Sequence, residues 1–519
     1  MHTLPRRRRA DTNLSINMAY EPFDRTEGSS QPPPQCQIYP VVFRIARALR
    51  QHAETHPAIP PFTSEQLCRI PTSAAKDVNQ AVESGARAFQ VWSQLSGSER
   101  GKFLTDAARL VRERRDVISA TETMDVGKTI TEARWDIDGM ADVLDFYASM
   151  ARTISGEHIT MPNGSFAYTR REPLGVCGGI GAWNYPFQMA VLKSAPALAC
   201  GNTMVFKPAP LTPMTAVMLA EVYQDVGIPE GCFNVIQGAA ETGQLLSSHP
   251  KIAKMSFTGS VQTGRKVMEA CAKDIKYVTL ELGGKSPLIV FADADLDNAV
   301  KGAIMANFLN QGQVCSNGTR VFVERSIRDQ FLEKLGRRMK AMKVGDPMEE
   351  DTFVGAMISK EQMEKTSSYI AGAKEEGAKV YCGGEILQPS PSLKGNFITP
   401  AVLVDCYDTM SAVQEEIFGS VMAVLEFDAE EEVIERANAT EYGLAGGVFT
   451  KDLSRAHRVA AKIQCGSFYI NTFNVTPTEV PFGGVKKSGI GREFGKVAIE
   501  FYSQLKSVYV ETGDVECPV

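Results

Sequence analysis

Apolar residues recur at helical spacing soon after residue 67 and mark the first predicted elements. In Asp77–Leu95 they lie three or four residues apart, as on one face of an amphipathic helix: Val78, Val82, Ala86, Phe89 and Trp92. Gly101–Arg114 repeats this spacing with Phe103, Leu104, Ala107 and Leu110. The sequence therefore predicts two consecutive helices in this part of the chain.

Farther along, short apolar runs alternate with helical patterns. Three strand–helix pairs follow one another: Gly175–Ile180 with Phe187–Ala199, Thr203–Phe206 with Thr212–Val226, and Phe233–Val235 with Glu241–Ser247. A second block of the same kind runs from Pro287 to about Pro481. Alternation of this kind predicts an α/β fold built on parallel sheets.

Two segments interrupt this alternation. In Glu157–Arg170 the turn sequence Pro162-Asn163-Gly164 separates two extended runs, which predicts a β-hairpin. Lys506–Glu511, near the end of the chain, is also extended. We expect it to be an edge strand that seeks a partner.

The first 65 residues differ in composition from the rest. They are rich in proline, lack lysine and contain the basic run Arg6–Arg9. Because such a segment buries little apolar surface, we expect it to be mobile. Arginine without lysine suits an organelle transit peptide, although acidic Asp11 and Glu21 do not. A gene-model artefact is the other explanation that the sequence leaves open.

Charge, cysteine and histidine exclude several classes of protein. A net charge of -6 offers no basic field to nucleic acid or to an anionic membrane. No run of about 18 apolar residues is present that would form a membrane-spanning helix. The 11 cysteines include no CxxC pair and the 6 histidines are scattered, so we expect no metal site. We expect a reducing compartment, the cytoplasm, with the mitochondrion as the alternative.

The first candidate for chemistry is Cys315, in the loop Asn310–Arg320 between a predicted helix (Asn298–Leu309) and a predicted strand (Arg320–Val323). Cysteine is usually buried and inert, and this remains the alternative interpretation. The loop is polar and contains Gly312 and Gly318, which favours an accessible nucleophile.

Glu281 is the second candidate, because it ends an apolar strand within Val278–Pro287. A carboxylate there pays a desolvation cost unless its surroundings use it. One interpretation is an edge residue paired with Lys285. The other is a general base whose pKa is raised toward neutral pH.

Two loops that follow apolar strands complete the set. Asn184, in Gly181–Pro186, either caps the next helix or aims its amide at a developing oxyanion. In Ser256–Gly264 a strand ends at Gly259-Ser260, where a helix begins. Backbone N–H groups and the helix dipole attract phosphate in this geometry, although the glycines are equally suited to close packing.

Together these segments resemble the aldehyde dehydrogenase superfamily. The matching motifs are Gly179–Pro186 (GIGAWNYP), Phe257–Ser260 (FTGS), Leu280–Pro287 (LELGGKSP), Gly312–Cys315 (GQVC), Phe206–Ala209, Glu415–Gly419, Pro481–Gly484 and Lys487–Glu493. The resemblance covers about Leu67 to Glu511. It implies that the protein is an NAD(P)-dependent enzyme.

The resemblance implies a Rossmann-like cofactor domain, an α/β catalytic domain and a small β oligomerisation arm. We assign 66–150 and 173–280 to the NAD-binding domain, 281–483 to the catalytic domain, and 151–172 with 495–519 to the arm; 1–65 is the atypical segment. In the family such an arm joins subunits into dimers or tetramers, so we expect a homo-oligomer.

The resemblance also implies a role for each site residue. Cys315 attacks the aldehyde, Asn184 and the Cys315 backbone N–H hold the oxyanion, Glu281 activates water and Glu493 assists proton release. The implied cofactor, NAD, contacts Lys207 at the adenosine ribose, Ser260 at the pyrophosphate, Glu416 at the nicotinamide ribose and Phe418 beside the nicotinamide. Trp183 and the turn formed by Thr258, Gly259, Ser260, Val261, Gln262, Thr263 and Gly264 complete that site.

Two positions depart from the family pattern. Pro210 stands where a glutamate often binds the adenosine ribose, which weakens a strict preference for NAD over NADP. Ser420 replaces the usual proline after Gly419, which is expected to loosen the loop that carries Glu416. In addition, residues 1–65 do not match the N-terminal strands that the family places at one edge of the cofactor domain.

Two longer segments, Gly181–Pro208 and Tyr502–Glu516, narrow the resemblance within the superfamily. They look most like the branch that oxidises 4-trimethylaminobutyraldehyde, which is close to the betaine-aldehyde enzymes. Tyr185, Phe473 and Phe482, with Glu479, would suit a quaternary ammonium group near the entrance. If these rings form an ordinary apolar tunnel, the enzyme has broad specificity. A catalytically silent homologue and an enzyme that releases acyl-CoA are further alternatives, against which the presence of both Cys315 and Glu281 argues.

Overall fold

The computed structural model describes residues 55–63, 66–515 and 517–519. Most of the atypical N-terminal segment thus lies outside the described residues. Its last part contains a strand that the sequence did not predict, β1 (Thr55–Ala58), which pairs antiparallel with β2 (Cys68–Pro71). Within the described residues, no helix is both long and apolar enough to cross a bilayer.

The first α/β unit contains a six-stranded sheet of order β19-β9-β8-β5-β6-β7. Its strands are β5 (Val176–Ile180), β6 (Thr203–Lys207), β7 (Phe233–Val235), β8 (Ile252–Thr258), β9 (Tyr277–Glu281) and β19 (Gly489–Ile490). All run parallel except β19, which returns from much later in the chain to pair antiparallel with β9. Glu281 therefore belongs to this sheet, although the sequence-based boundary assigned it to the catalytic domain.

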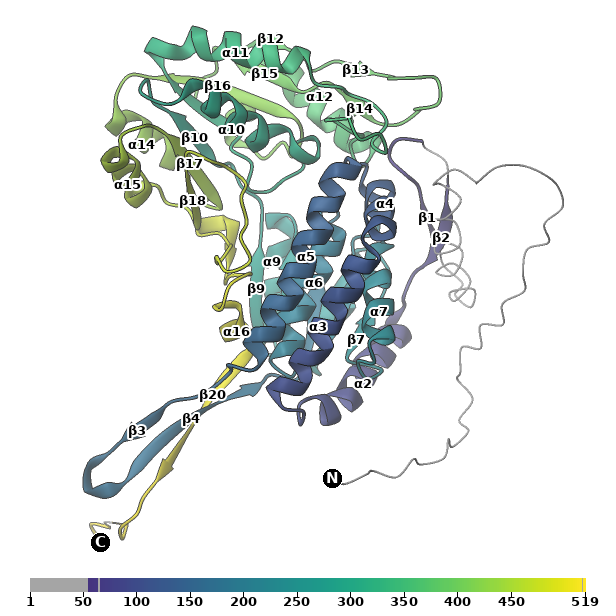
Figure 1. Cartoon of the computed structure of the whole chain (residues 1–519), viewed down its shortest axis with the longest axis vertical. Helices are drawn as coiled ribbons and strands as arrows, with labels where there is room; N and C mark the ends of the chain where they lie inside the picture. The colour runs from purple at the N-terminus through teal and green to yellow at the C-terminus, as the bar shows by residue number, and fades with distance from the viewer. Residues whose placement is uncertain (1–54, 64–65, 516) are drawn as a thin grey trace, which may run out of the picture.

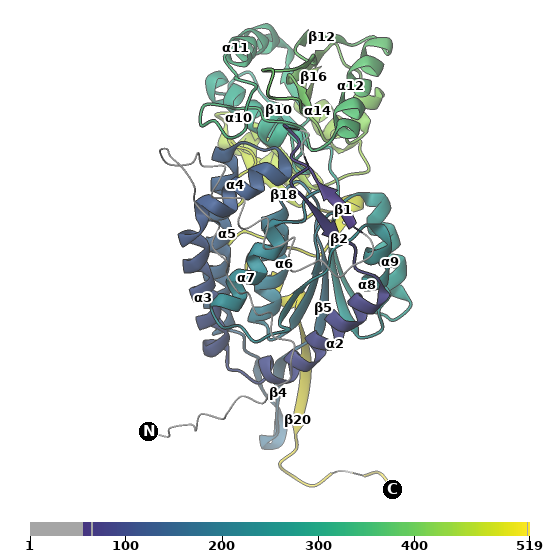
Figure 2. The same ribbon diagram turned by 90° about the vertical axis from the view of Figure 1, so that its right-hand side faces the viewer.

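Helices cover both faces of this sheet (Figure 2). One face packs on α2 (Ala75–Trp92), α8 (Ala240–Ser247) and α9 (Val261–Ala272). The other carries a thick layer formed by α3 (Gly97–Glu113), α5 (Ile130–Ala151), α6 (Pro186–Ala199) and α7 (Thr215–Asp225), with α4 (Arg115–Val126) beside it. Helix α3 begins earlier than predicted, because Ser96 and Glu99 form a capping box at its first turn.

The second α/β unit contains a seven-stranded sheet of order β12-β15-β16-β11-β10-β17-β18. Its strands are β10 (Pro287–Val290), β11 (Arg320–Glu324), β12 (Lys379–Cys382), β15 (Ala401–Val404), β16 (Val421–Phe427), β17 (Ala445–Phe449) and β18 (Ser467–Ile470). Only β12, at one edge, is antiparallel to its neighbour. The predicted start of this unit at Pro287 is confirmed.

Two helix layers enclose the second sheet. Helices α10 (Leu296–Phe308) and α11 (Arg328–Lys340) pack on one face. Helices α12 (Lys360–Glu375), α14 (Glu430–Asn438) and α15 (Leu453–Lys462) pack on the other. Short elements complete the fold: β13 (Ile386–Leu387), β14 (Phe397–Ile398), α13 (Ser411–Gln414), α16 (Ala498–Phe501) and the 3-10 turns η1 (Pro162–Gly164), η2 (Leu309–Gly312), η3 (Arg325–Ile327) and η4 (Lys486–Ser488).

A three-stranded sheet projects away from both units (Figure 1). The predicted hairpin forms β3 (His158–Thr160) and β4 (Phe166–Pro173), and its turn contains Asn163 at φ 61. The predicted C-terminal strand, β20 (Ser503–Val510), pairs antiparallel with β4 along its whole length. Its partner is thus supplied by the same chain, which leaves the other edge of β20 unpaired in this sheet.

Candidate active site

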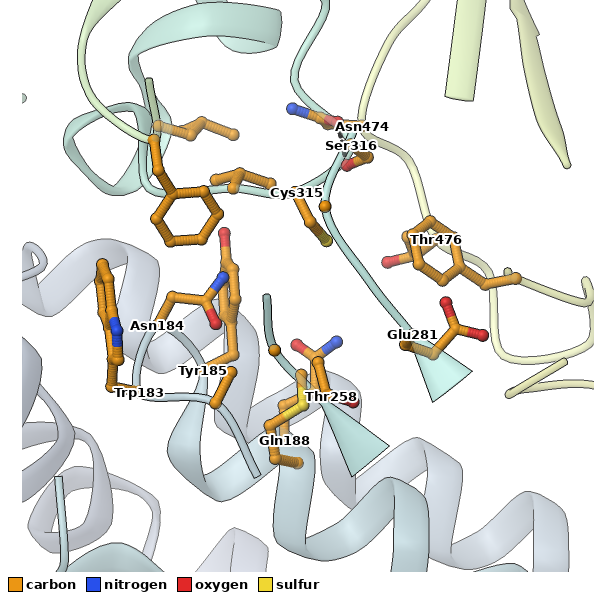
Figure 3. Close-up of a pocket in the computed structure, with 18 of the residues that line it drawn as sticks. Trp183, Asn184, Tyr185, Gln188, Thr258, Glu281, Cys315, Ser316, Asn474 and Thr476 are labelled. Atoms are coloured by element: carbon orange, nitrogen blue, oxygen red, sulfur yellow. Dashed lines mark hydrogen bonds between the residues drawn. The ribbon is translucent and has the colours of Figure 1, made fainter. Parts of the chain in front are cut away.

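A cavity of about 490 Å³ lies where the carboxyl ends of β8 and β9 meet the loop that follows α10 (Figure 3). Ligands commonly bind at the carboxyl ends of parallel strands. Ten of the predicted site residues line this cavity: Trp183, Asn184, Thr258, Gly259, Ser260, Glu281, Cys315, Glu416, Phe418 and Glu493. Segments far apart in sequence therefore meet at one place.

Cys315 lies at the end of a tightly wound loop. Three consecutive residues before it, Asn310, Gln311 and Gly312, have φ of 47, 54 and 73°. Gly312 is required there, because a Cβ atom would lie 2.3 Å from the backbone carbon of Gly419. The half-buried Cys315 faces the cavity. Burial, Glu416 and Glu281 raise the pKa of its thiol to about 12, so the free protein holds it as a thiol.

Asn184 is held by this same loop. Its Nδ2 donates to the carbonyl of Gln313 at 2.9 Å, and its own carbonyl accepts from Asn310 Nδ2 at 2.9 Å. The alternative role as a helix cap is wrong, because α6 has Tyr185 at its N-cap position and no side-chain cap. An amide nitrogen carries two hydrogens, so the second remains for an oxygen in the cavity.

Glu281 ends β9 and is buried. Neither carboxyl oxygen has a hydrogen-bond partner among the described residues. Burial and the negative charge of Glu493 raise its pKa well above the ordinary value, although Lys193 and Arg492 oppose this shift. The alternative ion pair with Lys285 is therefore wrong. A desolvated carboxyl group that titrates late is suited to accept a proton from water.

Glu493 is bound to Lys193, a residue that the sequence analysis missed. The Nζ of Lys193 lies 2.7 Å from Glu493 Oε1, and it also donates to Ser256 Oγ and Thr258 Oγ1. Both partners of this ion pair are almost completely buried. The available signal was a lysine within the mostly apolar helix Phe187–Ala199, because a charge there needs a buried partner.

The N-terminus of α9 opens onto the cavity. Ser260 is its N-cap and accepts a hydrogen bond from Thr263 N at 3.3 Å. The next residues predicted to bind the cofactor, Val261, Gln262, Thr263 and Gly264, form the first turn and do not line the cavity. At Gly264 the packing interpretation fits, since a Cβ atom would lie 2.6 Å from Leu282.

Another part of the cavity is lined by Glu416 and two aromatic rings. Glu416 Oε1 accepts a hydrogen bond from Gly284 N at 3.2 Å, and burial raises the pKa of its carboxyl group. The rings of Trp183 and Phe418 meet edge to face, with centroids 5.1 Å apart.

Lys207, at the end of β6, does not line the cavity. Its Nζ donates to the carbonyls of Pro208 and Gly238, and burial lowers the pKa of its ammonium group to about 8.

Two of the four residues expected near the entrance lie elsewhere. Tyr185 and Phe482 line the cavity as expected. Phe473 does not, because it is buried in the core of the second unit against Tyr469. Glu479 is exposed and does not line the cavity either. Trp135 of α5, which no motif marks in the sequence, also lines the cavity and is 57% exposed.

Among the described residues, no group of three or more His, Cys, Asp or Glu is arranged to hold a metal ion. The cavity instead combines a thiol, an amide donor, an unpaired buried carboxyl group and a helix N-terminus. This set can form and hydrolyse a covalent acyl group.

Comparison with known proteins identifies this combination. Residues 49–508 match the model of the aldehyde dehydrogenase family. The chain is 60% identical over 469 residues to 4-trimethylaminobutyraldehyde dehydrogenase A of Danio rerio, covering 90% of this chain and 92% of that one. It is 58% identical over 464 residues to 4-trimethylaminobutyraldehyde dehydrogenase of Homo sapiens, covering 89% and 94%.

A solved structure agrees with these relatives. The crystal structure of betaine aldehyde dehydrogenase from Staphylococcus aureus in complex with NAD+ superposes with a TM-score of 0.89 at 37% identity, covering 93% of this chain and 99% of that one. The chain is therefore a member of the aldehyde dehydrogenase family.

Proposed function

We propose that the protein oxidises an aldehyde bearing a quaternary ammonium group, such as 4-trimethylaminobutyraldehyde or betaine aldehyde, to its carboxylate with NAD. The observation that carries this proposal is one cavity whose lining combines Cys315, Asn184 and Glu281 with aromatic and acidic side chains. The names of the relatives support the same substrate class.

The cavity fits NAD in three respects. The N-terminus of α9, with Gly259 and Ser260 exposed to the cavity, suits a pyrophosphate. The carboxyl group of Glu416 suits ribose hydroxyls, and the Trp183–Phe418 pair suits the flat nicotinamide ring. When bound, NAD would supply the acceptor for a hydride.

In the first stage of the reaction, Cys315 is the nucleophile. Its thiol must first lose a proton to solvent, because its pKa is about 12 in the free protein. The sulfur then bonds to the aldehyde carbon, and the carbonyl oxygen becomes an oxyanion. The free N–H of Asn184 and the backbone N–H of Cys315 stabilise that oxyanion. Loss of hydride from the same carbon leaves a thioester on Cys315.

In the second stage, Glu281 is the general base. Its carboxylate takes a proton from water while the water oxygen attacks the thioester carbon. The C–S bond breaks as the carboxylic acid product leaves, and the Cys315 sulfur takes up the proton that Glu281 accepted. Glu493, ion-paired with Lys193 and close enough to Glu281 to raise the pKa of its carboxyl group, is positioned to assist in releasing that proton.

Other residues of the cavity lining suit a cation. Trp135 and Tyr185 contribute aromatic rings, and Glu132 and Asp136 contribute carboxyl groups. Aromatic faces and carboxylates both attract a quaternary ammonium group. If the rings form only an apolar tunnel, the enzyme acts on aldehydes broadly.

We further propose that the projecting sheet is an oligomerisation arm that joins identical subunits into dimers or tetramers. Its apolar side chains are exposed, among them Ile159, Met161, Leu505 and Tyr509. Exposed apolar surface of this kind is typical of interfaces.

We propose the cytoplasm as the compartment. Every cysteine among the described residues has a free thiol, which supports a reducing environment.

Substrate class is tested by kcat/KM for 4-trimethylaminobutyraldehyde against the analogue with a tert-butyl group in place of the ammonium group. The proposal expects the cation to be preferred by roughly 2- to 30-fold, the value of one cation–π contact. Equal or better use of the neutral analogue would contradict it. The same NADH assay with added CoA tests release of acyl-CoA, and we expect CoA to leave the rate unchanged.

A further inference from the structure

A buried lysine lies behind the wall of the cavity. Lys128 sits between α4 and α5, after Gly127, which ends α4 at φ 86°, and before Thr129, the N-cap of α5. Its side chain has no exposed surface. A buried ammonium group costs free energy unless nearby groups compensate its charge. The groups that contact Lys128 therefore show which parts of the structure it stabilises.

Three groups surround the ammonium of Lys128. Its Nζ lies 2.6 Å from Asp136 Oδ2 and 3.6 Å from Glu122 Oε1. It also lies 3.8 Å from the centroid of the Tyr185 ring. Tyr185 directly follows Asn184, so the lysine contacts the residue next to the predicted oxyanion donor.

The nearby carboxyl groups hold the two loops that form the reacting site. Glu122 Oε2 accepts a hydrogen bond at 3.3 Å from Phe187 N, at the start of α6, where no local side chain caps the helix. Glu132 Oε1 accepts one at 2.7 Å from Asn310 N. Asn310 in turn donates to the carbonyl of Asn184. One carboxyl group thus fixes the Asn184 loop and the other fixes the Cys315 loop.

Both carboxyl groups need a nearby positive charge to remain ionised. Burial raises the pKa of Glu122 and of Glu132 to about 7, and Lys128 is the largest influence that opposes this rise in each. Without the ammonium group, the two carboxyl groups would take up protons at neutral pH. A protonated carboxyl group is a weaker acceptor for a backbone N–H.

We propose that Lys128 is a positioning residue for aldehyde oxidation: it sets the distance between Asn184 and Cys315 through Tyr185 and the carboxyl groups of Glu122 and Glu132. It touches neither substrate nor cofactor in this role. The inference rests on aldehyde oxidation by Cys315, and it adds a determinant outside the cavity lining. A displacement of about 1 Å in such a site lowers rates by roughly 10²-fold.

The test compares Lys128→Met with wild type in the NADH burst of a single turnover, using an uncharged aldehyde so that recognition of a cation plays no part. We expect a burst rate about 10- to 100-fold lower, with the KM for NAD little changed. The rate should recover as pH rises, because the carboxyl groups ionise again at higher pH; a shift of about one to three pH units is expected. Lys128→Arg should restore part of the rate.

Lys254→Met is the matched control. Lys254 is also buried in the first unit, where it bonds Thr279 and lies 4.7 Å from the ring centroid of Tyr502. A merely structural role for Lys128 predicts similar losses of Tm in both variants, with no shift of the pH profile in either. That result, or a normal burst in Lys128→Met, would overturn the proposal.

If Lys128→Met does not fold, Glu132→Gln provides the test. It keeps the shape of the side chain but replaces the charged acceptor of Asn310 N. We expect a burst about 3- to 30-fold slower, the effect of weakening one charge-assisted hydrogen bond, at a Tm near that of wild type. An unchanged burst would overturn the proposal. Failure of the wild type to oxidise any aldehyde would instead contradict the proposed function.

Discussion

Two sets of residues that line the cavity come from different kinds of segment. The reacting set, Cys315, Glu281 and Asn184, lies in short motifs at the end of a strand or in a tight loop. The aromatic set comes from separate elements: Trp135 from α5, Tyr185 from the start of α6 and Phe482 from a segment after β18. Predictions from sequence placed the first set in the cavity but only part of the second.

The difference follows from what each set must do. A nucleophile and an oxyanion donor need a fixed backbone, and this constrains their immediate neighbours: Gly312, for example, is required beside Gly419. A cation needs only rings or carboxylates at suitable distances, which separate elements can supply. The reacting set should therefore be intolerant of substitution and the aromatic set tolerant, and the following predictions test that contrast.

The largest effect is expected for Cys315→Ala. Aldehyde oxidation should fall by about 10⁴-fold or more, because the nucleophile is lost, while binding of NAD persists. The measurement is NADH formation, with NAD binding followed by calorimetry. Cys177→Ala is the control, since Cys177 is buried in β5 away from the cavity. Near-normal turnover by Cys315→Ala would exclude it as the nucleophile.

The next largest effect is expected for Glu281→Gln. It should give a burst of about one NADH per site and then a steady rate lower by roughly 10² to 10⁴, because the thioester forms but is not hydrolysed. Loss of the burst would mean that Glu281 acts before hydride transfer.

The pH dependence of hydrolysis should reveal the same carboxyl group. Because burial and Glu493 raise its pKa, Glu281 is protonated over a wider range and becomes a base only as pH rises. The steady rate of the wild type should therefore increase with pH through the neutral range. Glu281→Gln should lose that increase, and a rate that falls with pH in the wild type would contradict the assignment.

A smaller effect is expected for the aromatic set. Trp135→Ala should lower kcat/KM for 4-trimethylaminobutyraldehyde by roughly 2- to 30-fold and that for its tert-butyl analogue by less, since only the cation gains from the ring face. Phe473→Leu and Glu479→Gln should leave the ratio of the two substrates unchanged. If the substrate ratio changed in Glu479→Gln but not in Trp135→Ala, the cation would lie near Glu479 and not near Trp135, which would contradict the proposal.

The smallest effect is expected at Pro210. We expect NAD to be preferred modestly over NADP, and Pro210→Glu should sharpen the preference by about 2- to 5-fold, because a partly exposed charge contributes at most about 1 kcal/mol. The ratio of kcat/KM for the two cofactors measures it. Equal use of both cofactors by the wild type would contradict the expected preference.

Sequence alone predicted the α/β class, the hairpin and its turn, the C-terminal strand and the start of the second unit at Pro287. Short-range signals carry these features: strand–helix alternation and turn residues. It did not predict that Gly489–Ile490 would return to pair with β9, because such a pairing joins residues that are far apart in the chain. Helices α4 and α5 were also missed, although Gly127 and Thr129 mark the boundary between them.

At the site, the sequence could not separate the alternatives for Asn184 and Glu281, because each was settled by contacts between distant parts of the chain. The side chain of Asn184 donates to Gln313. Glu281 has no hydrogen-bond partner among the described residues. Lys193 was missed for the same reason, because its partner Glu493 lies 300 residues away. Trp135 belongs to α5 and Lys128 to the turn between α4 and α5. The packing of these helices, and not a motif of their own, places Trp135 in the cavity lining and Lys128 behind it.

The central claim is a thioester on Cys315, and mass spectrometry tests it most directly. Glu281→Gln is mixed with NAD and 4-trimethylaminobutyraldehyde, quenched in acid and digested. The account predicts that the peptide containing Cys315 carries the acyl group, in an amount equal to the NADH released. NADH formation with an unmodified Cys315, or with the acyl group on another cysteine, would contradict it.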